Sequence, residues 1–337
     1  MPPTPRILSL GEVLWDLLPS GPVLGGAPAN FAIHCHALGA HATLRSCIGD
    51  DRLGEDILDR LEDLGLPLEL IRREAGMPTG TTDVAFDHEG QPQYTIKAPA
   101  AWDFLRADLD ARNEAKRADA ICFGSLAQRN QVSREGIRSL LAAASASALI
   151  VFDTNLRQDF YSREILEHAL GAATLLKLNT EELDVLAGIF DLPGGPSAVM
   201  AQLAQNFSLR HVALTKGSAG SLLLSDGNWH EHPGIPVVLQ DPIGAGDAFT
   251  AALVIALLSG WDAGRANGFA NEVAAYVASQ PGATPALPQA LRERIRQSPP
   301  SAAVPPSVGP ARIPEPRIPE ASPACPIGSA PPPAFPA

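Results

Sequence analysis

Short apolar runs alternate with helix-like patterns along most of this chain, and no other feature limits its possible folds as strongly. The runs have the length and composition of buried strands and cover residues 6–11, 41–48, 118–123, 148–152, 175–178 and 211–215. Segments with helical spacing stand between them, at residues 27–38, 53–64, 134–144, 163–169, 181–187 and 196–205. Because strands that alternate with helices form βαβ units, we expect an α/β fold with a doubly wound, mostly parallel sheet.

Residues 79–96 interrupt this alternation. The segment TGTTDVAFDHEGQPQYTI has the pattern of two strands around a turn at Glu89-Gly90, with no helix between them. A β-hairpin inserted early in a doubly wound chain predicts a small β lid over a site.

The composition changes near Ser298, and Pro, Ala and Ser dominate residues 298–337. Such a segment buries too little apolar surface to offset the entropy of ordering, so we expect a disordered tail, with a Pro-rich recognition motif as the alternative. The folded domain is then expected to span residues 4–297.

Charge and cysteine usage exclude several classes of protein. The formal net charge of −12 argues against nucleic acid or anionic lipid as a partner. The four cysteines form no C-x-x-C pair, which is typical of the reduced thiols of a cytoplasmic protein. We find neither a signal peptide nor an apolar run of about 18 residues, so no membrane partner is expected.

Polar or glycine-rich turns follow the predicted strands. They occupy residues 12–16, 25–30, 153–157, 179–182, 215–220 and 244–247. Ligands of parallel α/β sheets gather at the carboxyl ends of the strands, so these turns predict one large polar site.

The turn Gly244-Ala245-Gly246-Asp247 opens an apolar helical pattern. Small residues let successive backbone N–H groups point outward, and the helix N-terminus adds positive potential, so the turn predicts an anion pocket. Asp247 is placed to accept a proton from a substrate hydroxyl beside a transferring phosphoryl group. The alternative is a tight turn with Asp247 as a helix cap.

Two other turns also have two interpretations each, and two more offer groups for a ligand. Asn179 and Glu182 form either a capping box or a site where Glu182 holds Mg²⁺ directly or through water. Residues 215–220 form either a nucleotide loop or a strand-to-strand turn. Asp16, Gly25, Gly26 and Asn30 offer groups suited to sugar hydroxyls. The P-loop and dinucleotide-binding glycine motifs are both absent, which argues against an NAD-dependent dehydrogenase.

The segments GGAPANFA and DPIGAGDAF resemble the two signature regions of the phosphofructokinase-B, or ribokinase-like, carbohydrate kinases. The resemblance covers about residues 6–290. It implies the ribokinase-like fold, with a β lid at about residues 12–24 and 79–103, and an ATP-dependent sugar kinase with Mg²⁺ as cofactor. It also leaves open a homodimer formed through the lid.

The resemblance implies a role for each matching residue. Asp247 would be the catalytic base, and Gly244, Ala245 and Gly246 would form the anion hole. The implied sugar contacts are Asp16, Gly25, Gly26, Asn30 and Arg157. The implied ATP contacts are Asn179, Thr215, Gly217, Gly220 and Asn271, and Glu182 would hold Mg²⁺ through water.

Two departures from the family pattern bear on ligands. Asp241-Pro242 replaces the usual Asp-Thr, which argues against the monovalent-cation loop of some relatives. The lid lacks a Gly-Ser-Ala turn that many fructokinases have, which weakens the choice of sugar. Fructose is the expected acceptor; 2-keto-3-deoxygluconate, ribose and a nucleoside are alternatives, as is a non-catalytic sugar-binding regulatory protein.

Overall fold

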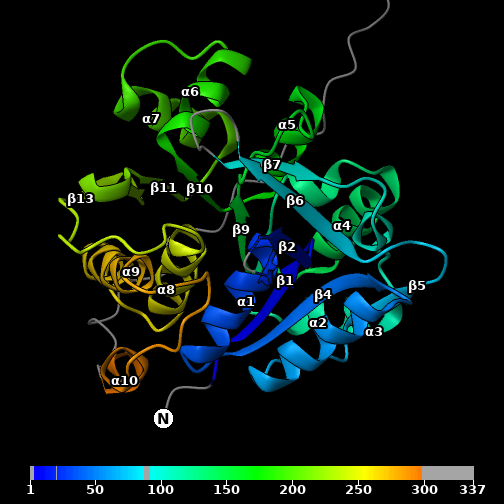
Figure 1. Cartoon of the computed structure of the whole chain (residues 1–337). Coiled ribbons are helices and arrows are strands. Elements are labelled where there is room, and N and C mark those ends of the chain that lie inside the picture. Colours follow the sequence, from blue (N-terminus) through cyan, green and yellow to red (C-terminus); the bar gives the residue numbers. More distant parts are fainter. Residues whose placement is uncertain (1–3, 20, 87–91, 298–337) are drawn as a thin grey trace, which may run out of the picture. The chain divides into compact units, whose positions relative to one another are not determined.

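A nine-stranded sheet forms the centre of the computed structural model, which describes residues 4–19, 21–86 and 92–297 (Figure 1). The strand order is β13-β12-β11-β10-β9-β8-β1-β4-β5. The strands are β1 (Arg6–Leu10), β4 (His41–Gly49), β5 (Ile71–Glu74), β8 (Ala120–Phe123), β9 (Leu149–Asp153), β10 (Leu175–Asn179), β11 (His211–Thr215), β12 (Ser221–Ser225) and β13 (Asn228–His232). All neighbouring pairs from β11 to β5 are parallel, and β12 and β13 extend the sheet in antiparallel fashion.

Helices cover both faces of this sheet, as expected for a doubly wound fold. One face packs against α1 (Ala27–Ala37), α2 (Arg52–Asp63), α8 (Ala245–Leu258) and α9 (Ala263–Ala278), with α10 (Gln289–Gln297) at its margin. The other face packs against α3 (Leu109–Arg117), α4 (Gln131–Ala143), α5 (Arg163–Ala172), α6 (Thr180–Ile189) and α7 (Pro196–Phe207). Adjacent residues of one strand point to opposite faces, so Ile7 joins the first apolar cluster and Leu8 the second.

The second sheet is the small one predicted from the hairpin. Its order is β3-β2-β6-β7, formed by β2 (Leu14–Leu18), β3 (Gly21–Gly25), β6 (Gly80–Phe86) and β7 (Pro92–Ile96). β6 and β7 are antiparallel, as predicted, and their turn at Glu89-Gly90 lies outside the described residues. The sheet ends at Ile96, short of residue 103: a 3-10 turn at Ala101–Phe104 follows, and its Trp102 is buried in the second apolar cluster of the main domain.

Helix α8 brings the predicted catalytic turn to the sheet. Its residues from Ala248 to Ala256 are all buried, because the segment is apolar on every side and lies between α1, α9 and the sheet. Its N-terminus therefore has a fixed position.

The structure also bears on the expectations about membrane segments and cysteines. None of the helices in the described part of the chain is long and apolar enough to cross a membrane. Cys35, Cys47 and Cys122 are free and buried, whereas Cys325 and the predicted tail lie outside the described residues.

Candidate active site

The strand register brings the predicted turns together at the carboxyl ends of the parallel strands. Asn179, the last residue of β10, pairs with Thr215, the last residue of β11. Lys177 of β10 pairs with Asp153 at the end of β9. The loops after these strands therefore lie side by side, as the strand-end rule predicts.

Gly244 begins the turn at the head of α8. Its φ of 77° is in the left-handed region, which favours glycine, and the helix starts at Ala245. Within the described part of the chain, no hydrogen-bond acceptor is present for the N–H groups of Gly246 and Asp247. Two amides without an acceptor at the positive end of a helix are the groups that the predicted anion pocket needs, whereas the amide of Ala245, also predicted to contribute, donates to the Pro242 carbonyl at 3.4 Å.

Asp247 lies in the first turn of α8, next to these amides. Its Oδ2 accepts a hydrogen bond of 2.8 Å from Nδ2 of Asn30 in α1, a residue 217 positions away in the sequence. Burial raises the pKa of Asp247, while the charge of Lys177 and the bond from Asn30 oppose the rise. No side-chain hydrogen bond caps the N-terminus of α8, so the interpretation of Asp247 as a helix cap lacks its hydrogen bond.

Of the predicted sugar contacts, Asn30 touches Asp247 and Asp16 lies on the lid. Asn30 is buried, and its Oδ1 has no partner among the described residues. Asp16 lies on lid strand β2, where burial raises its pKa and Thr82 and Arg157 oppose the rise. A Cβ at Gly25 would lie 2.6 Å from the Asp16 carboxylate, so a larger residue at this position would clash with Asp16.

Gly26 and Arg157 are the other two residues predicted to bind the sugar. Gly26 has a φ of 104°, and a Cβ there would lie 2.5 Å from the backbone oxygen of Glu12. The exposed Arg157 is close enough to lower the pKa of Asp16, Asp247 and Glu12 by its charge.

Asn179 and Glu182 form a complete capping box at the start of α6. Both oxygens of Glu182 accept hydrogen bonds within the protein: Oε2 from Thr154 Oγ1 at 2.7 Å and from the Asn179 amide at 2.9 Å, and Oε1 from the Leu156 amide at 3.0 Å. A carboxylate has about four lone-pair positions, so Oε1, which accepts one bond, still has room for one further donor such as a metal-bound water, whereas Oε2 already accepts two. The described residues contain no group of three or more His, Cys, Asp and Glu that could hold a metal ion by themselves.

The 215–220 segment joins antiparallel strands β11 and β12 through a short 3-10 turn at Gly217–Ala219, so it is a strand-to-strand turn in form. Gly217 and Gly220 have φ values of 56° and 81°. A Cβ at Gly220 would lie 2.1 Å from the backbone oxygen of His232, so only glycine fits. Thr215 donates from Oγ1 to the carbonyl of Leu178 at 3.3 Å.

Asn271 lies in α9 behind this turn. Its Nδ2 donates to Ser221 Oγ at 2.7 Å and to the Asn267 carbonyl at 2.8 Å. These bonds attach α9 to β12, so the amide nitrogen of Asn271 is already engaged within the protein.

Asp241 precedes the predicted catalytic turn and bonds to backbone amides on two segments. Its two carboxylate oxygens accept from the amides of Ile243 at 2.9 Å and Gly282 at 3.1 Å. Backbone N–H groups thus satisfy the acid beside Pro242.

Three acidic and basic residues of the site were given no role by sequence reasoning. Lys177 and Asp153 form a buried ion pair of 3.1 Å. Glu12 is buried next to Asp247, Arg157 and Arg129, and its Oε2 has no partner among the described residues. Burial raises the pKa of Glu12 to about 7. The signal for Lys177 was a single charge inside the apolar run Leu-Leu-Lys-Leu.

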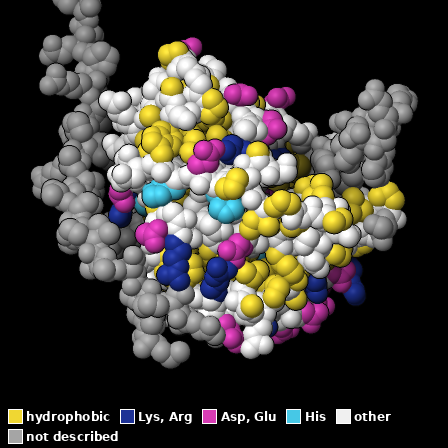
Figure 2. All heavy atoms as spheres, turned by 90° about the vertical axis from the view of Figure 1, so that its left-hand side faces the viewer, with side chains coloured by type: hydrophobic (Ala, Val, Ile, Leu, Met, Phe, Trp, Pro, Cys, Tyr) yellow, Lys and Arg dark blue, Asp and Glu magenta, His cyan; other side chains and the backbone are white. Residues whose placement is uncertain are grey.

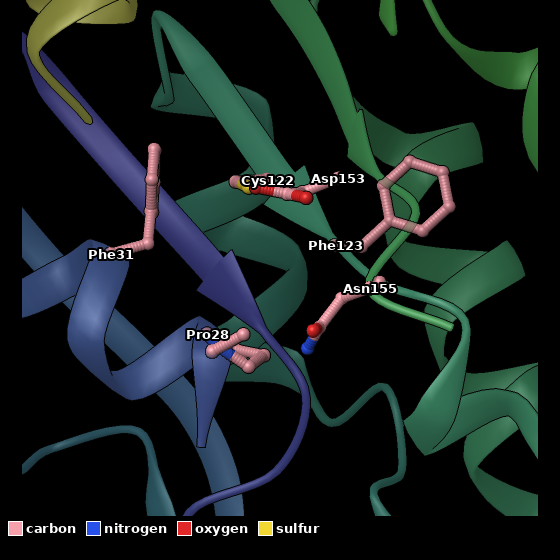
Figure 3. Close-up of a pocket in the computed structure, with 8 residues that line it drawn as sticks. Pro28, Phe31, Cys122, Phe123, Asp153 and Asn155 are labelled. Carbon is pink, nitrogen blue, oxygen red and sulfur yellow. The ribbon is translucent and has the colours of Figure 1, made fainter. Parts of the chain in front are cut away.

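A small cavity lies below this cluster, between α1 and the ends of β8 and β9. Figure 3 shows Asp153 near Cys122 and Asn155 directed toward Pro28. Its volume of about 10 Å³ is close to the minimum for one water molecule, so it is no substrate site. A separate groove of about 1090 Å³ between β3, α1, α2 and residues 281–293 is lined by none of the predicted site residues.

Comparisons with known proteins by family, sequence and structure all match carbohydrate kinases. Residues 22–290 match the pfkB family carbohydrate kinase. A fructokinase of Klebsiella pneumoniae is 31% identical over 264 residues, which cover 75% of this chain and 84% of the relative. A fructokinase structure from Vibrio cholerae O395 with fructose, ADP and calcium ion bound superposes with a TM-score of 0.74 at 26% identity, covering 87% of this chain and 99% of that one. A Xylella fastidiosa fructokinase structure with bound ATP, at 24% identity and a TM-score of 0.76 over 87% and 98% of the two chains, shares the fold.

Proposed function

Since the chain belongs to the pfkB family of carbohydrate kinases, we propose that it transfers the γ-phosphoryl group of ATP to a hydroxyl group of fructose. The observation that carries the proposal is the Asp247 carboxylate, held by Asn30 beside the open amides of the α8 N-terminus. The names of the relatives support fructose: one is called a fructokinase and another was solved with fructose and ADP.

In the proposed reaction Asp247 accepts the proton of the attacking sugar hydroxyl. The oxygen then forms a bond to the γ-phosphorus, the bond from this phosphorus to the β,γ-bridging oxygen breaks, and ADP leaves. The amides of Gly246 and Asp247 stabilise the negative charge on the transferring group, together with the α8 dipole. Most of the rate enhancement comes from positioning and charge stabilisation.

ATP is proposed to lie between the 215–220 turn and the 244–247 turn. Residues 233–243 run from one turn to the other. Gly234 packs closely against the 215–220 turn, because a Cβ there would lie 2.4 Å from the Ser218 carbonyl, and the segment ends at the 244–247 turn. On the side of the protein at the left of Figure 1, hydrophobic side chains are exposed between charged ones (Figure 2). The exposed large hydrophobic residues after β13 are Val237, Val238, Leu239 and Ile243. Such a segment offers an apolar surface for the adenine base.

A divalent cation, with Mg²⁺ as the expected ion, would neutralise charge on the ATP phosphates. Mg²⁺ keeps several waters and is commonly held by one or two carboxylates and by phosphates. The remaining lone-pair position on Oε1 of Glu182 fits such water-mediated binding, whereas direct coordination would compete with the three donors that this carboxylate already has.

The sugar is proposed to lie between the lid and α1. The free Oδ1 of Asn30 and the carboxylate of Asp16 are acceptors for sugar hydroxyls. Arg157 is exposed near Asp16 and Asp247 and is a contact for an acidic sugar, which keeps 2-keto-3-deoxygluconate as the second candidate substrate. A homodimer through the lid and a cytoplasmic location, where ATP is supplied, complete the proposal.

A coupled ADP-release assay over fructose, 2-keto-3-deoxygluconate, ribose and adenosine tests the proposal. We expect sugar-dependent ADP release that requires a divalent cation and is fastest with fructose. Faster turnover of another sugar would change the substrate. Absence of turnover with all four, at Mg²⁺ and ATP concentrations in the millimolar range, would instead favour the non-catalytic sugar-binding protein.

A further inference from the structure

Lys177 places a buried positive charge under the proposed catalytic turn. The residue lies in β10 and is 7% exposed. Its Nζ donates to Asp153 Oδ1 at 3.1 Å, and this is the one acceptor that the described residues provide for its three N–H donors. A lysine is rarely buried this deeply, so the pair needs an explanation.

The ammonium group faces the turn itself. A Cβ at Gly246 would lie 3.0 Å from Lys177 Nζ, so the absence of a side chain there lets the charge approach the turn directly. Thr250, one helical turn after Gly246, donates to Asp153 Oδ2 at 2.8 Å. The ion pair is thereby attached to α8 as well as to β9 and β10.

The charged groups that act on Lys177 include the acids of the candidate active site. Burial disfavours its charged form, but the carboxylates of Asp153, Glu182 and Asp247 together raise its pKa, so it stays an ammonium. Of the charged groups that lower the pKa of Asp247, Lys177 has the largest effect. A lysine that served only as the counter-ion of Asp153 would interact with that one acid, whereas Lys177 interacts with three.

We propose that Lys177 is a positioning residue for phosphoryl transfer, whose buried charge beside Gly246 adds to the positive potential of the proposed anion pocket. This proposal rests on the proposed kinase function. The competing interpretation is that Lys177 merely neutralises buried Asp153 and stabilises the fold. The two differ in what happens when Asp153 no longer needs a counter-ion.

A double-mutant cycle separates them. Lys177→Met alone leaves Asp153 buried without its partner, so that variant is expected to lose stability and activity together. Asp153→Asn retains an acceptor for Thr250 and leaves the Lys177 charge in place. The double variant Asp153→Asn/Lys177→Met removes both charges and is expected to regain the stability lost in Lys177→Met. Lys116→Met, the same substitution on an exposed lysine of α3, is the matched control.

The readouts are melting temperature, kcat, and KM for ATP and for the sugar. We expect Asp153→Asn to keep kcat within about tenfold of wild type, and the double variant to lose a further ~10²-fold in kcat with little change in either KM, the size typical of one lost electrostatic contact to a transition state. A folded double variant with the kcat of Asp153→Asn would overturn the proposal. An inactive wild type would overturn the kinase function as well, so the two failures are distinguishable.

Discussion

Gly244→Ala is the sharpest test of how the catalytic turn is built. Gly244 has a φ of 77°, and an alanine in the left-handed region costs about 1–2 kcal/mol. In addition, the new Cβ would lie 2.3 Å from the carbonyl oxygen of Ala283 and 2.7 Å from its Cα.

This clash has to be relieved by moving the turn. Ordinary contact begins at 3.4 Å, so one of the two backbones must shift by about 1 Å. Ala283 is the less free to move, because its carbonyl accepts a hydrogen bond of 3.0 Å from buried His34 and the adjacent Gly282 amide is bonded to Asp241. A displacement of about 1 Å at a catalytic group costs on the order of 10²-fold in rate.

Steady-state ADP release gives kcat, and urea unfolding gives the free energy of unfolding. The matched control is Gly227→Ala in the β12–β13 turn, where φ is 79° and a Cβ meets no atom within 4 Å. Both variants lose stability because alanine is unfavourable in the left-handed region, but we expect only Gly244→Ala to lose about 10²-fold in kcat. Equal kcat values for the two variants would refute the argument that this contact sets the position of the turn.

Two further predictions concern buried polar groups of the site. Glu12 keeps its proton in the folded state up to a pKa of about 7, whereas the unfolded chain loses it near 4.5, so ionising this acid destabilises the fold as the pH rises through that window. Glu12→Gln should therefore gain stability over wild type by up to about 3 kcal/mol between pH 4.5 and pH 7.5 in urea unfolding, and a pH-independent difference would contradict this. Asn30→Ala removes the 2.8 Å bond to Asp247 and the proposed sugar contact, so kcat/KM for the sugar should fall about 10–100-fold while KM for ATP stays the same; a change confined to the KM for ATP would argue against this placement.

The family and the fold predicted from the sequence are confirmed. They were predictable because apolar periodicity fixes which face of each strand and helix is buried, and because parallel strands direct their carboxyl-end turns to one edge. The glycine turn at the head of α8 was predictable from the same local rules, since its conformation depends on residues adjacent in the chain.

The pairings within the site could not be predicted in this way. Asn30 meets Asp247 only because α1 packs against α8, and Lys177 meets Asp153 only because β9 and β10 align in one register. The raised pKa of Glu12 depends on burial, and the residue itself gives no sign of it in the sequence. Sequence reasoning also left the role of Asn179 and Glu182 open, and the structure contains the capping box without excluding a water-mediated metal contact.

The most direct test of the account is the rate of phosphoryl transfer in Asp247→Asn. Asparagine keeps the shape and the neighbours of the carboxylate but cannot accept the proton, so kcat should fall by about 10²–10⁴-fold, the range typical of a lost general base, with ATP affinity nearly unchanged. Asp59→Asn, on the exposed face of α2, is the control. If Asp247→Asn phosphorylates the sugar at the wild-type rate, Asp247 is not the base and the proposed mechanism is wrong.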